Sequence, residues 1–234
     1  MILLEISGLK KDYQALRPLR IAQLRVTAGQ VLAVGGIDGP AAEKLTHLIT
    51  GATLPDEGTV TLFGQNTREI ADVESWLQSL DGVGMVSARG TVVGSFSVLQ
   101  NIALSFTLHV DPIDPRVVPQ AGALARSVGI SESLFDLPAG TVAPDVGMRV
   151  QLARSLALGP KLLIAEHPSA GLPREAVAAF GADLARAAQS RGLALLAITA
   201  DEALSKAIGG QRLELNAATG DVRAPGLLRK LFGS

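Results

Sequence analysis

Short apolar runs alternate with helical patterns along the chain. Residues 31–34, 83–86, 161–165 and 193–199 are almost wholly apolar, as expected of strands buried on both faces. The stretches between them repeat apolar residues at helical spacing. Strands that alternate with helices predict a mostly parallel sheet covered on both sides. We expect helices at residues 40–50, 72–80, 98–108, 117–129, 148–158, 174–191 and 202–208.

A second group of strands lies outside this alternation. Residues 2–7 and 19–26 have the pattern of strands, and residues 59–64 form another strand that ends in glycine. Residues 211–215 and 219–223 suit a terminal hairpin. These strands predict an antiparallel edge beside the parallel sheet.

The expected elements form one α/β domain over residues 1–223. The stretch at about 98–158 is mainly helical and lies between core strands, so we expect it to form a helical subdomain within that domain. Residues 224–234 are expected to be a C-terminal tail.

The stretch from Val31 to Gly51 combines a strand, a glycine-rich turn and a helix. Gly36 and Gly39 lie in the turn, and Pro40 suits the first turn of a helix because its missing N–H is not needed there. Free amides and the helix dipole converge on one point in such an arrangement. The stretch therefore predicts the architecture of a phosphate cradle.

The residues expected inside such a cradle are missing. The phosphate-binding loop has the pattern G-x-x-x-x-G-K-[ST]. Counted from Gly36, the second glycine falls on Ala41, the lysine on Ala42 and the hydroxyl on Glu43. Lys44 follows two residues after the lysine position, about 200° around the helix, so it is no substitute.

These replacements predict a large loss of affinity for a triphosphate. The lysine supplies a charge-assisted bond of about 1.5–3 kcal/mol. A carboxylate at about 4 Å from a phosphate adds up to ~4 kcal/mol of repulsion at an effective dielectric constant near 20. The alternative is an ordinary strand–turn–helix, in which Asp38 and Glu43 complement the helix dipole.

Composition narrows the class of protein. Apolar residues make up 47% of the 234 residues, the net charge is −1 and there is no basic block, so nucleic acid is not an expected partner. The chain has no cysteine and three scattered histidines, which predicts neither disulfides nor a metal cluster. Its start lacks the basic region of a signal peptide, so we expect a cytoplasmic protein.

A longer match points to a family. Residues 149–172 have the sequence RVQLARSLALGPKLLIAEHPSAGL, which resembles the nucleotide-binding subunit of an ATP-binding cassette (ABC) transporter. DEGTVTLFG at residues 56–64 and SVLQNIAL at residues 97–104 match the same family, and the resemblance covers residues 2–220. It implies a P-loop NTPase-like fold, ATP as ligand, a transmembrane permease as partner, and a homo- or heterodimer with another such subunit.

The resemblance also assigns roles to positions near the cradle. Tyr13 corresponds to the aromatic residue that stacks on adenine, although a half-buried core tyrosine is the alternative. The lysine and Ser/Thr of the family correspond to Ala42 and Glu43, and its magnesium-sensing glutamine corresponds to Ala88. Its signature sequence L-S-G-G-Q corresponds to residues 142–146, where this chain has VAPDV.

The positions that carry out hydrolysis in the family depart as well. The Walker B aspartate corresponds to Glu166, the catalytic glutamate to His167, the D-loop aspartate to Pro173 and the switch histidine to Ala200. Glu166 still offers a carboxylate, and His167 has the chemistry of a base near neutral pH. The alternative is that both residues only hydrogen-bond within the end of their strand.

The stretches that match the family and the substitutions at its functional positions together predict a subunit that has kept the fold but lost the residues for hydrolysis. We expect no catalytic residue and no metal ligand, weak ATP binding and no firm Mg²⁺ site. The nucleotide-facing positions are expected to be Tyr13, Gly36, Asp38, Gly39, Ala41, Ala42, Glu43, Glu166 and His167. Such a subunit would lie at the inner face of the membrane through a permease. Two alternatives are an active transport ATPase with divergent motifs and a soluble scaffold or regulatory protein on the same fold.

Overall fold

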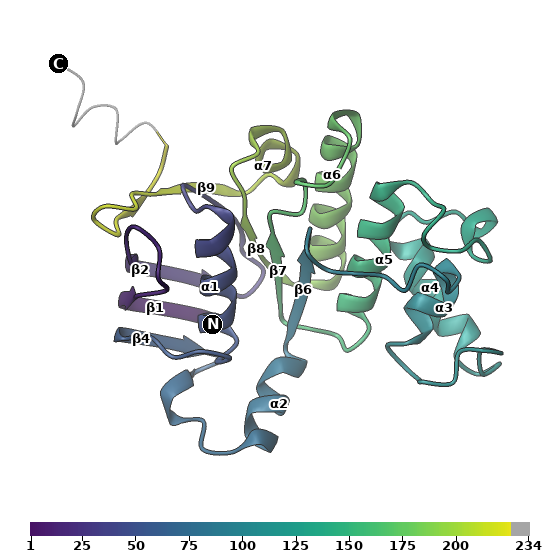
Figure 1. The fold of residues 1–234 in the computed structure, drawn as a ribbon, viewed down its shortest axis with the longest axis horizontal. Coiled ribbons are helices and arrows are strands. Elements are labelled where there is room, and N and C mark those ends of the chain that lie inside the picture. Colours follow the sequence, from purple (N-terminus) through teal and green to yellow (C-terminus); the bar gives the residue numbers. More distant parts are fainter. Residues whose placement is uncertain (226–234) are drawn as a thin grey trace.

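The computed structural model describes residues 1–225. The larger of two sheets lies in the middle of the molecule, the smaller sheet lies at one end, and a group of helices lies at the other end (Figure 1). The predicted C-terminal tail, residues 224–234, lies outside the described residues except for residues 224 and 225. Within residues 1–225, none of the helices combines the length and the apolar character that crossing a bilayer requires.

The larger sheet has the strand order β10-β9-β3-β8-β7-β6. Its central strands pair in parallel, as predicted. Only the short hairpin at its edge is antiparallel. The strands are β3 (Val31–Gly35), β6 (Val83–Ser87), β7 (Leu162–Glu166), β8 (Ala194–Ile198), β9 (Gln211–Leu215) and β10 (Val222–Arg223).

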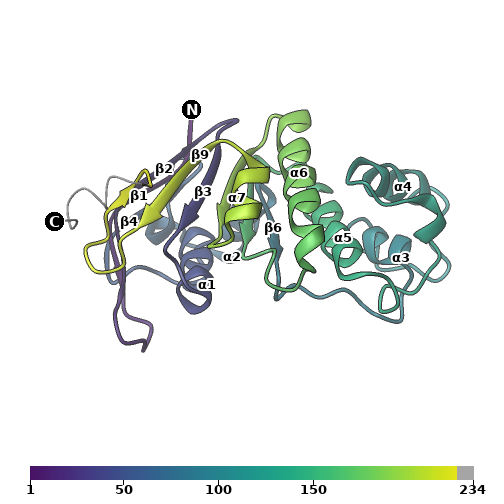
Figure 2. The ribbon, with the colours of Figure 1, turned by 90° about the horizontal axis from the view of Figure 1, so that it is seen from above.

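The smaller sheet is antiparallel and has the order β2-β1-β4-β5. It confirms the predicted antiparallel edge as a separate layer beside the parallel sheet, as Figure 2 shows. Its strands are β1 (Ile2–Lys11), β2 (Leu19–Thr27), β4 (Glu57–Leu62) and β5 (Gln65–Asn66).

Alternate residues of the parallel strands face two different cores. In β8, Ala194, Leu196 and Ile198 join a cluster with the antiparallel sheet and α1, whereas Leu195 and Ala197 join a cluster with the helices. Burial on both faces explains why these strands are continuous apolar runs. The helices are α1 (Gly39–Ile49), α2 (Val73–Asp81), α3 (Val98–Ala103), α4 (Val118–Ser127), α5 (Pro144–Leu156), α6 (Arg174–Arg191) and α7 (Glu202–Ile208).

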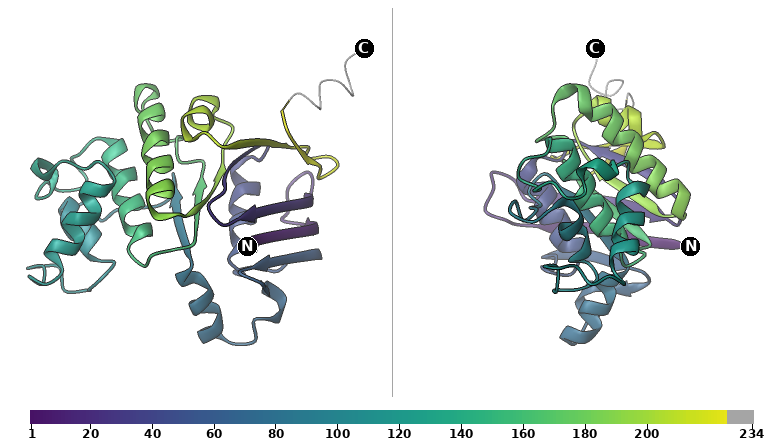
Figure 3. Two further views of the ribbon diagram at one scale, coloured as in Figure 1. Left: turned by 180° about the vertical axis from the view of Figure 1, so that it is seen from behind. Right: turned by 90° about the vertical axis from the view of Figure 1, so that its right-hand side faces the viewer.

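The helices α3, α4 and α5 form what we call the helical region, which lies at the far end of the molecule from the antiparallel sheet (Figure 3). Its apolar residues belong to the same cluster as α6 and one face of the parallel sheet. Within this region, α5 packs on β6 and α6.

Two helix boundaries differ from the prediction by more than two residues. The helix expected over residues 98–108 ends at Ala103, because the chain folds back and the side chain of Gln100 donates to the carbonyl of Val110 at 2.9 Å. The helix expected from Met148 already begins at Pro144, where proline suits the first turn.

The predicted terminal hairpin forms, but it has a second role. β9 pairs with β10 in antiparallel fashion and with β3 in parallel, so residues 211–215 extend the central sheet. This parallel partner was not predicted from the sequence.

Candidate functional site

The glycine turn after β3 is fixed against β9. Gly36 has a positive φ of 75°, and a Cβ atom there would lie 2.3 Å from the carbonyl oxygen of Leu215. Only glycine fits this combination of backbone angle and close approach. The turn is therefore held in place and leads directly into the N-terminus of α1.

Asp38 occupies the N-terminus of α1. Its carboxylate accepts a hydrogen bond from the amide of Ala41 at 2.9 Å, and Pro40 lies in the first turn. Asp38 is thus the N-cap of α1, and its carboxylate lies where the strand–turn–helix alternative expects it to complement the helix dipole. One of the amides that a bound phosphate would use already has a carboxylate as partner.

The main feature of the site is an arginine that joins two carboxylates. The Nη2 atom of Arg89 lies 2.6 Å from Oε1 and 2.9 Å from Oε2 of Glu166, and its Nη1 atom pairs with Glu43. Glu43 lies on α1, Arg89 follows β6, and Glu166 is the last residue of β7. We call these three residues the ion set.

The ion set combines a buried carboxylate with more exposed partners. The side chain of Glu166 is 4% exposed, whereas that of Arg89 is 48% exposed. The hydroxyl of Thr46 donates a further bond to Oε2 of Glu166 at 3.2 Å. Two carboxylates against one guanidinium leave the set with a formal charge of −1, which disfavours a polyphosphate.

The residues present do not fit a magnesium–triphosphate group. Magnesium needs oxygen ligands in a near-octahedral arrangement, and both oxygens of Glu166 already face the guanidinium of Arg89. The hydroxyl position holds the carboxylate of Glu43, and the lysine position holds Ala42, which is 0% exposed. No catalytic step can be derived through this group here.

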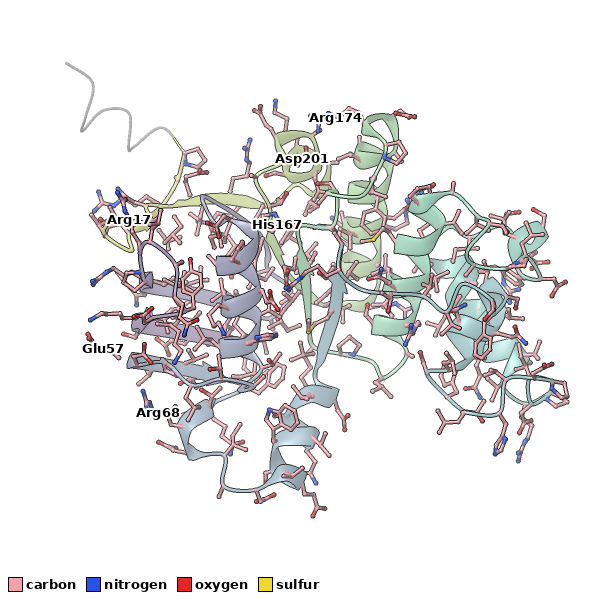
Figure 4. All side chains as sticks on the ribbon, viewed as in Figure 1. Arg17, Glu57, Arg68, His167, Arg174 and Asp201 are labelled. Carbon is pink, nitrogen blue, oxygen red and sulfur yellow. The ribbon has the colours of Figure 1, made fainter. Side chains whose placement is uncertain are left out.

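His167 lies directly after the ion set. Its backbone has a positive φ of 40°, and its amide donates to the carbonyl of Ile198 at 2.8 Å. The Nε2 atom is buried and has no hydrogen-bond partner among the described residues. Figure 4 shows His167 between α1 and α6. The backbone of His167 therefore forms a hydrogen bond at the end of its strand, which agrees with the alternative that this residue only hydrogen-bonds there. Among the described residues, none orients its imidazole through Nε2.

The predicted nucleotide-facing residues divide between two cavities. One, of about 470 Å³, is lined by Tyr13, Gly36, Asp38 and Ala41. The other, of about 480 Å³, is lined by Gly39, Glu43, Glu166 and His167, together with Arg89. Ala42 lines neither of these cavities because it is packed in the core. Both cavities border the start of α1, so most of the predicted nucleotide-facing residues lie close together in space.

Tyr13 is half-buried at the mouth of the first cavity. Burial raises the pKa of its hydroxyl, and the negative charge of Asp38 raises it further. The ring also packs against the core cluster of the antiparallel sheet. Both predicted roles, a stacking aromatic and a core residue, are compatible with this position.

The segment that corresponds to the family signature leads into a helix. Pro144 is the first residue of α5, and the side chain of Asp145 pairs with Arg149 one turn later. Arg149 in turn donates to Asp183 of α6 at 2.8 Å. The carboxylate of Asp145 is therefore used within the fold rather than offered to a ligand.

Asp201 follows the position of the switch histidine and caps α7. Its carboxylate accepts from the amides of Ala203 at 2.9 Å and Leu204 at 3.2 Å, and Arg174 donates to it at 2.8 Å; Arg174 and Asp201 lie together in Figure 4. Burial raises the pKa of Asp201, but these hydrogen bonds and the charge of Arg174 outweigh it, so the pKa lies below its ordinary value.

We expect Asp201→Ala to lower the free energy of unfolding by about 1 kcal/mol at neutral pH, as for other lost N-caps. Because the pKa of Asp201 is depressed in the folded state, its contribution is complete above the unfolded pKa of about 3.9 and is lost as the pH falls through the folded value. Urea denaturation of both proteins between acid and neutral pH measures this. A difference that stays constant down to the lowest pH would contradict the assignment.

Arg89 is the residue that sequence reasoning missed. It directly follows Ala88, the position that the resemblance marks, and β6 pairs with β7 so that Ser87 lies opposite Glu166. The signal was a basic residue just after one parallel strand and an acid at the end of another. Using it requires the knowledge that these two strands are neighbours in the sheet.

Relatives with similar sequences are ATP-binding proteins of transport systems, while no family model matches the chain. The lipoprotein-releasing system ATP-binding protein LolD of Acinetobacter baylyi is 28% identical over 183 residues, which cover 78% of this chain and 80% of that protein. The Fe(3+) ions import ATP-binding protein FbpC of Serratia marcescens is 30% identical over 208 residues, which cover 88% of this chain and 58% of that protein.

Solved structures with the same fold are ATP-binding cassettes. A dimeric cassette in a post-hydrolysis state, bound to ADP and Pi, has a TM-score of 0.75 at 18% identity, with 94% of this chain and 96% of that chain covered. cbiO1 from Clostridium perfringens, part of the transporter complex cbiONQ, has a TM-score of 0.77 at 20% identity, with 100% of this chain and 91% of that chain covered. These matches establish the fold.

Proposed function

We propose that this chain, which has the sequence pattern and the fold of an ABC transporter ATP-binding subunit, is a catalytically degenerate member of that family. It would bind a transmembrane permease at the inner face of the membrane and transmit or brace its conformational change. An active ATPase subunit in a heterodimer would supply the hydrolysis. The observation that carries the proposal is the ion set, in which Arg89 binds both carboxylates near the phosphate turn.

Phosphoryl transfer depends on positioned charges, and this site does not provide them. Transfer to water requires cations on the phosphates and a group that orients the attacking water. Here Arg89, the cation that lines the cavity with Gly39 and His167, is already neutralised by Glu43 and Glu166. His167, at the position of the catalytic glutamate, has a buried Nε2 without a partner to orient it.

Turnover measurements test the loss of catalysis. We expect the purified chain to hydrolyse ATP no faster than its Glu166→Gln variant, because neither has a lysine or a hydroxyl in the phosphate turn. Turnover by the natural chain that Glu166→Gln abolishes would support the second candidate, an active ATPase. That candidate has one specific observation in its favour, namely that Arg89 provides a cation within the site.

Affinity capture from detergent-solubilised membranes tests the partner. Recovery of a polytopic membrane protein in a stable complex with the chain would support a transporter subunit. Recovery of soluble partners alone would contradict it and favour a scaffold or regulatory protein. An active cassette captured with the permease would support the heterodimer.

A further inference from the structure

The loop that follows β6 is held from two sides. Residues 87–91, which we call the strap, lead from the central sheet toward the helical region. On one side, Arg89 binds Glu166 of β7 and Glu43 of α1. The strap is therefore anchored to two separate elements of the core by one side chain.

On its other side the strap is bonded to α5. The side-chain amide of Gln151 donates to the carbonyl of Gly90 at 2.7 Å, and its oxygen lies 3.4 Å from the amide of Ser87. Arg154, one turn further along α5, donates to the carbonyl of Thr91 at 3.3 Å. These bonds use backbone atoms of the strap, so they fix its path and not only its side chains.

The strap also fits closely where it meets α5. A Cβ atom on Gly90 would lie 2.2 Å from Oε1 of Gln151, so a side chain at this position would displace the amide from its place. Glycine at position 90 thus leaves the space that the side-chain amide of Gln151 occupies against the strap. The bonds on the two sides join α1, β7 and α5 through five consecutive residues.

We propose that the strap is a permanent ionic tie, in which Arg89 holds the helical region in a fixed orientation against the core without any ligand. Every group in the tie belongs to this chain: the cation is Arg89, and the anions are Glu43 and Glu166. Arg89 acts as a positioning residue, since it links elements and has no reacting atom to contact. The tie goes beyond the proposed function, because it concerns the orientation of the helical region rather than its use by a partner.

A distance measurement without nucleotide tests the tie. The chain has no cysteine, so Gln23→Cys on β2 and Gln120→Cys on α4 place spin labels on the core and on the helical region. We expect a single narrow distance distribution in the natural background. Arg89→Met should widen this distribution at least about twofold, because a methionine cannot bind either carboxylate. Arg89→Lys keeps the positive charge, so its distribution should be narrower than that of Arg89→Met but wider than that of the natural chain.

Two controls separate the tie from a general loss of stability. Arg174→Met breaks an ion pair between α6 and α7, and Val60→Ala weakens the other core cluster, which does not include the helical region. Neither variant should widen the distribution. A folded Arg89→Met protein with the natural width, or equal widening in the two controls, would overturn the proposal. Should Arg89→Met fail to fold, Gln151→Leu with Arg154→Met removes the α5 side while leaving Glu166 paired. Widening in that protein supports the tie, and an unchanged width overturns it.

The outcome is independent of the proposed function. All of these distributions are recorded in the absence of nucleotide, so tight MgATP binding by the natural chain would defeat the proposed loss of catalysis and leave the tie unaffected. Conversely, an inactive chain whose Arg89→Met variant keeps a narrow distribution would retain the proposed function and lose the tie.

Discussion

Replacing Arg89 by methionine is expected to lower the free energy of unfolding by about 2–3 kcal/mol. Among residues 1–225, the change leaves the buried carboxylate of Glu166 with the hydroxyl of Thr46 as its remaining polar contact. Loss of one partner of a fully buried ion pair costs about 3–5 kcal/mol. Because 48% of the Arg89 side chain is exposed, water relieves part of that cost. Denaturant unfolding of the natural chain and the variant measures the difference.

A double variant identifies the buried charge as the cause. Arg89→Met combined with Glu166→Gln should recover most of the lost stability, since a neutral amide can stay buried near Thr46 at a lower cost. Arg174→Met is the matched control, because that side chain is 72% exposed and a surface pair contributes about 0–1 kcal/mol. If Arg89→Met and Arg174→Met were equally stable, the ion set would stabilise the fold no more than a surface ion pair does.

Restoring the family residues in the phosphate turn should raise the affinity for MgATP by about 10–100-fold. The variant is Ala42→Lys with Glu43→Ser, which supplies the lysine and the hydroxyl and removes one carboxylate. The added charge-assisted bond contributes about 1.5–3 kcal/mol, and each 1.4 kcal/mol is a factor of ten in affinity. Equilibrium titration of both proteins with MgATP measures the gain.

The control variant places at position 42 a side chain of about the same length as lysine that has no charge. Ala42→Met with Glu43→Ser imposes a similar strain on a fully buried position and also removes the carboxylate. We expect it to gain little affinity compared with the lysine variant. Equal affinities of the two folded variants would mean that the missing lysine is not what weakens the site.

Most of the fold could be predicted because it rests on local patterns. The apolar runs at β3, β7 and β8 are buried on both faces, as the two core clusters confirm. β6 differs, because it is the edge strand of the sheet and its Met85 is 42% exposed. The helices α6 and α7 begin and end where the sequence predicts. These elements have clear periodicity and clear ends, so they need little information from the rest of the chain.

The differences arise where distant contacts decide the structure. The end of α3 depends on the bond from Gln100 to Val110, and the place of β9 depends on its pairing with β3. Neither contact is visible in the local pattern. The early start of α5 is different, because proline at position 144 is compatible with a first helical turn as well as with a loop.

The candidate site was predicted as a set of positions, but not as a chemical arrangement. The resemblance aligned Glu43 and Glu166 with the phosphate turn and the Walker B strand, and the structure brings both to one cavity. What they bind could not be predicted, because Arg89 reaches them only when β6 lies beside β7 and the loop after β6 turns back. The positive charge at the site therefore comes from a residue that the family pattern does not mark.

Calorimetric titration of the natural chain with ATP, with and without Mg²⁺, tests the central claim most directly. Because Arg89 is already paired with two carboxylates and the ion set has a formal charge of −1, we predict binding weaker than about 1 mM and no effect of Mg²⁺. The Ala42→Lys, Glu43→Ser variant shows in the same experiment that regained affinity can be detected. Saturable, Mg²⁺-dependent binding by the natural chain with a Kd in the micromolar range or tighter would contradict the account.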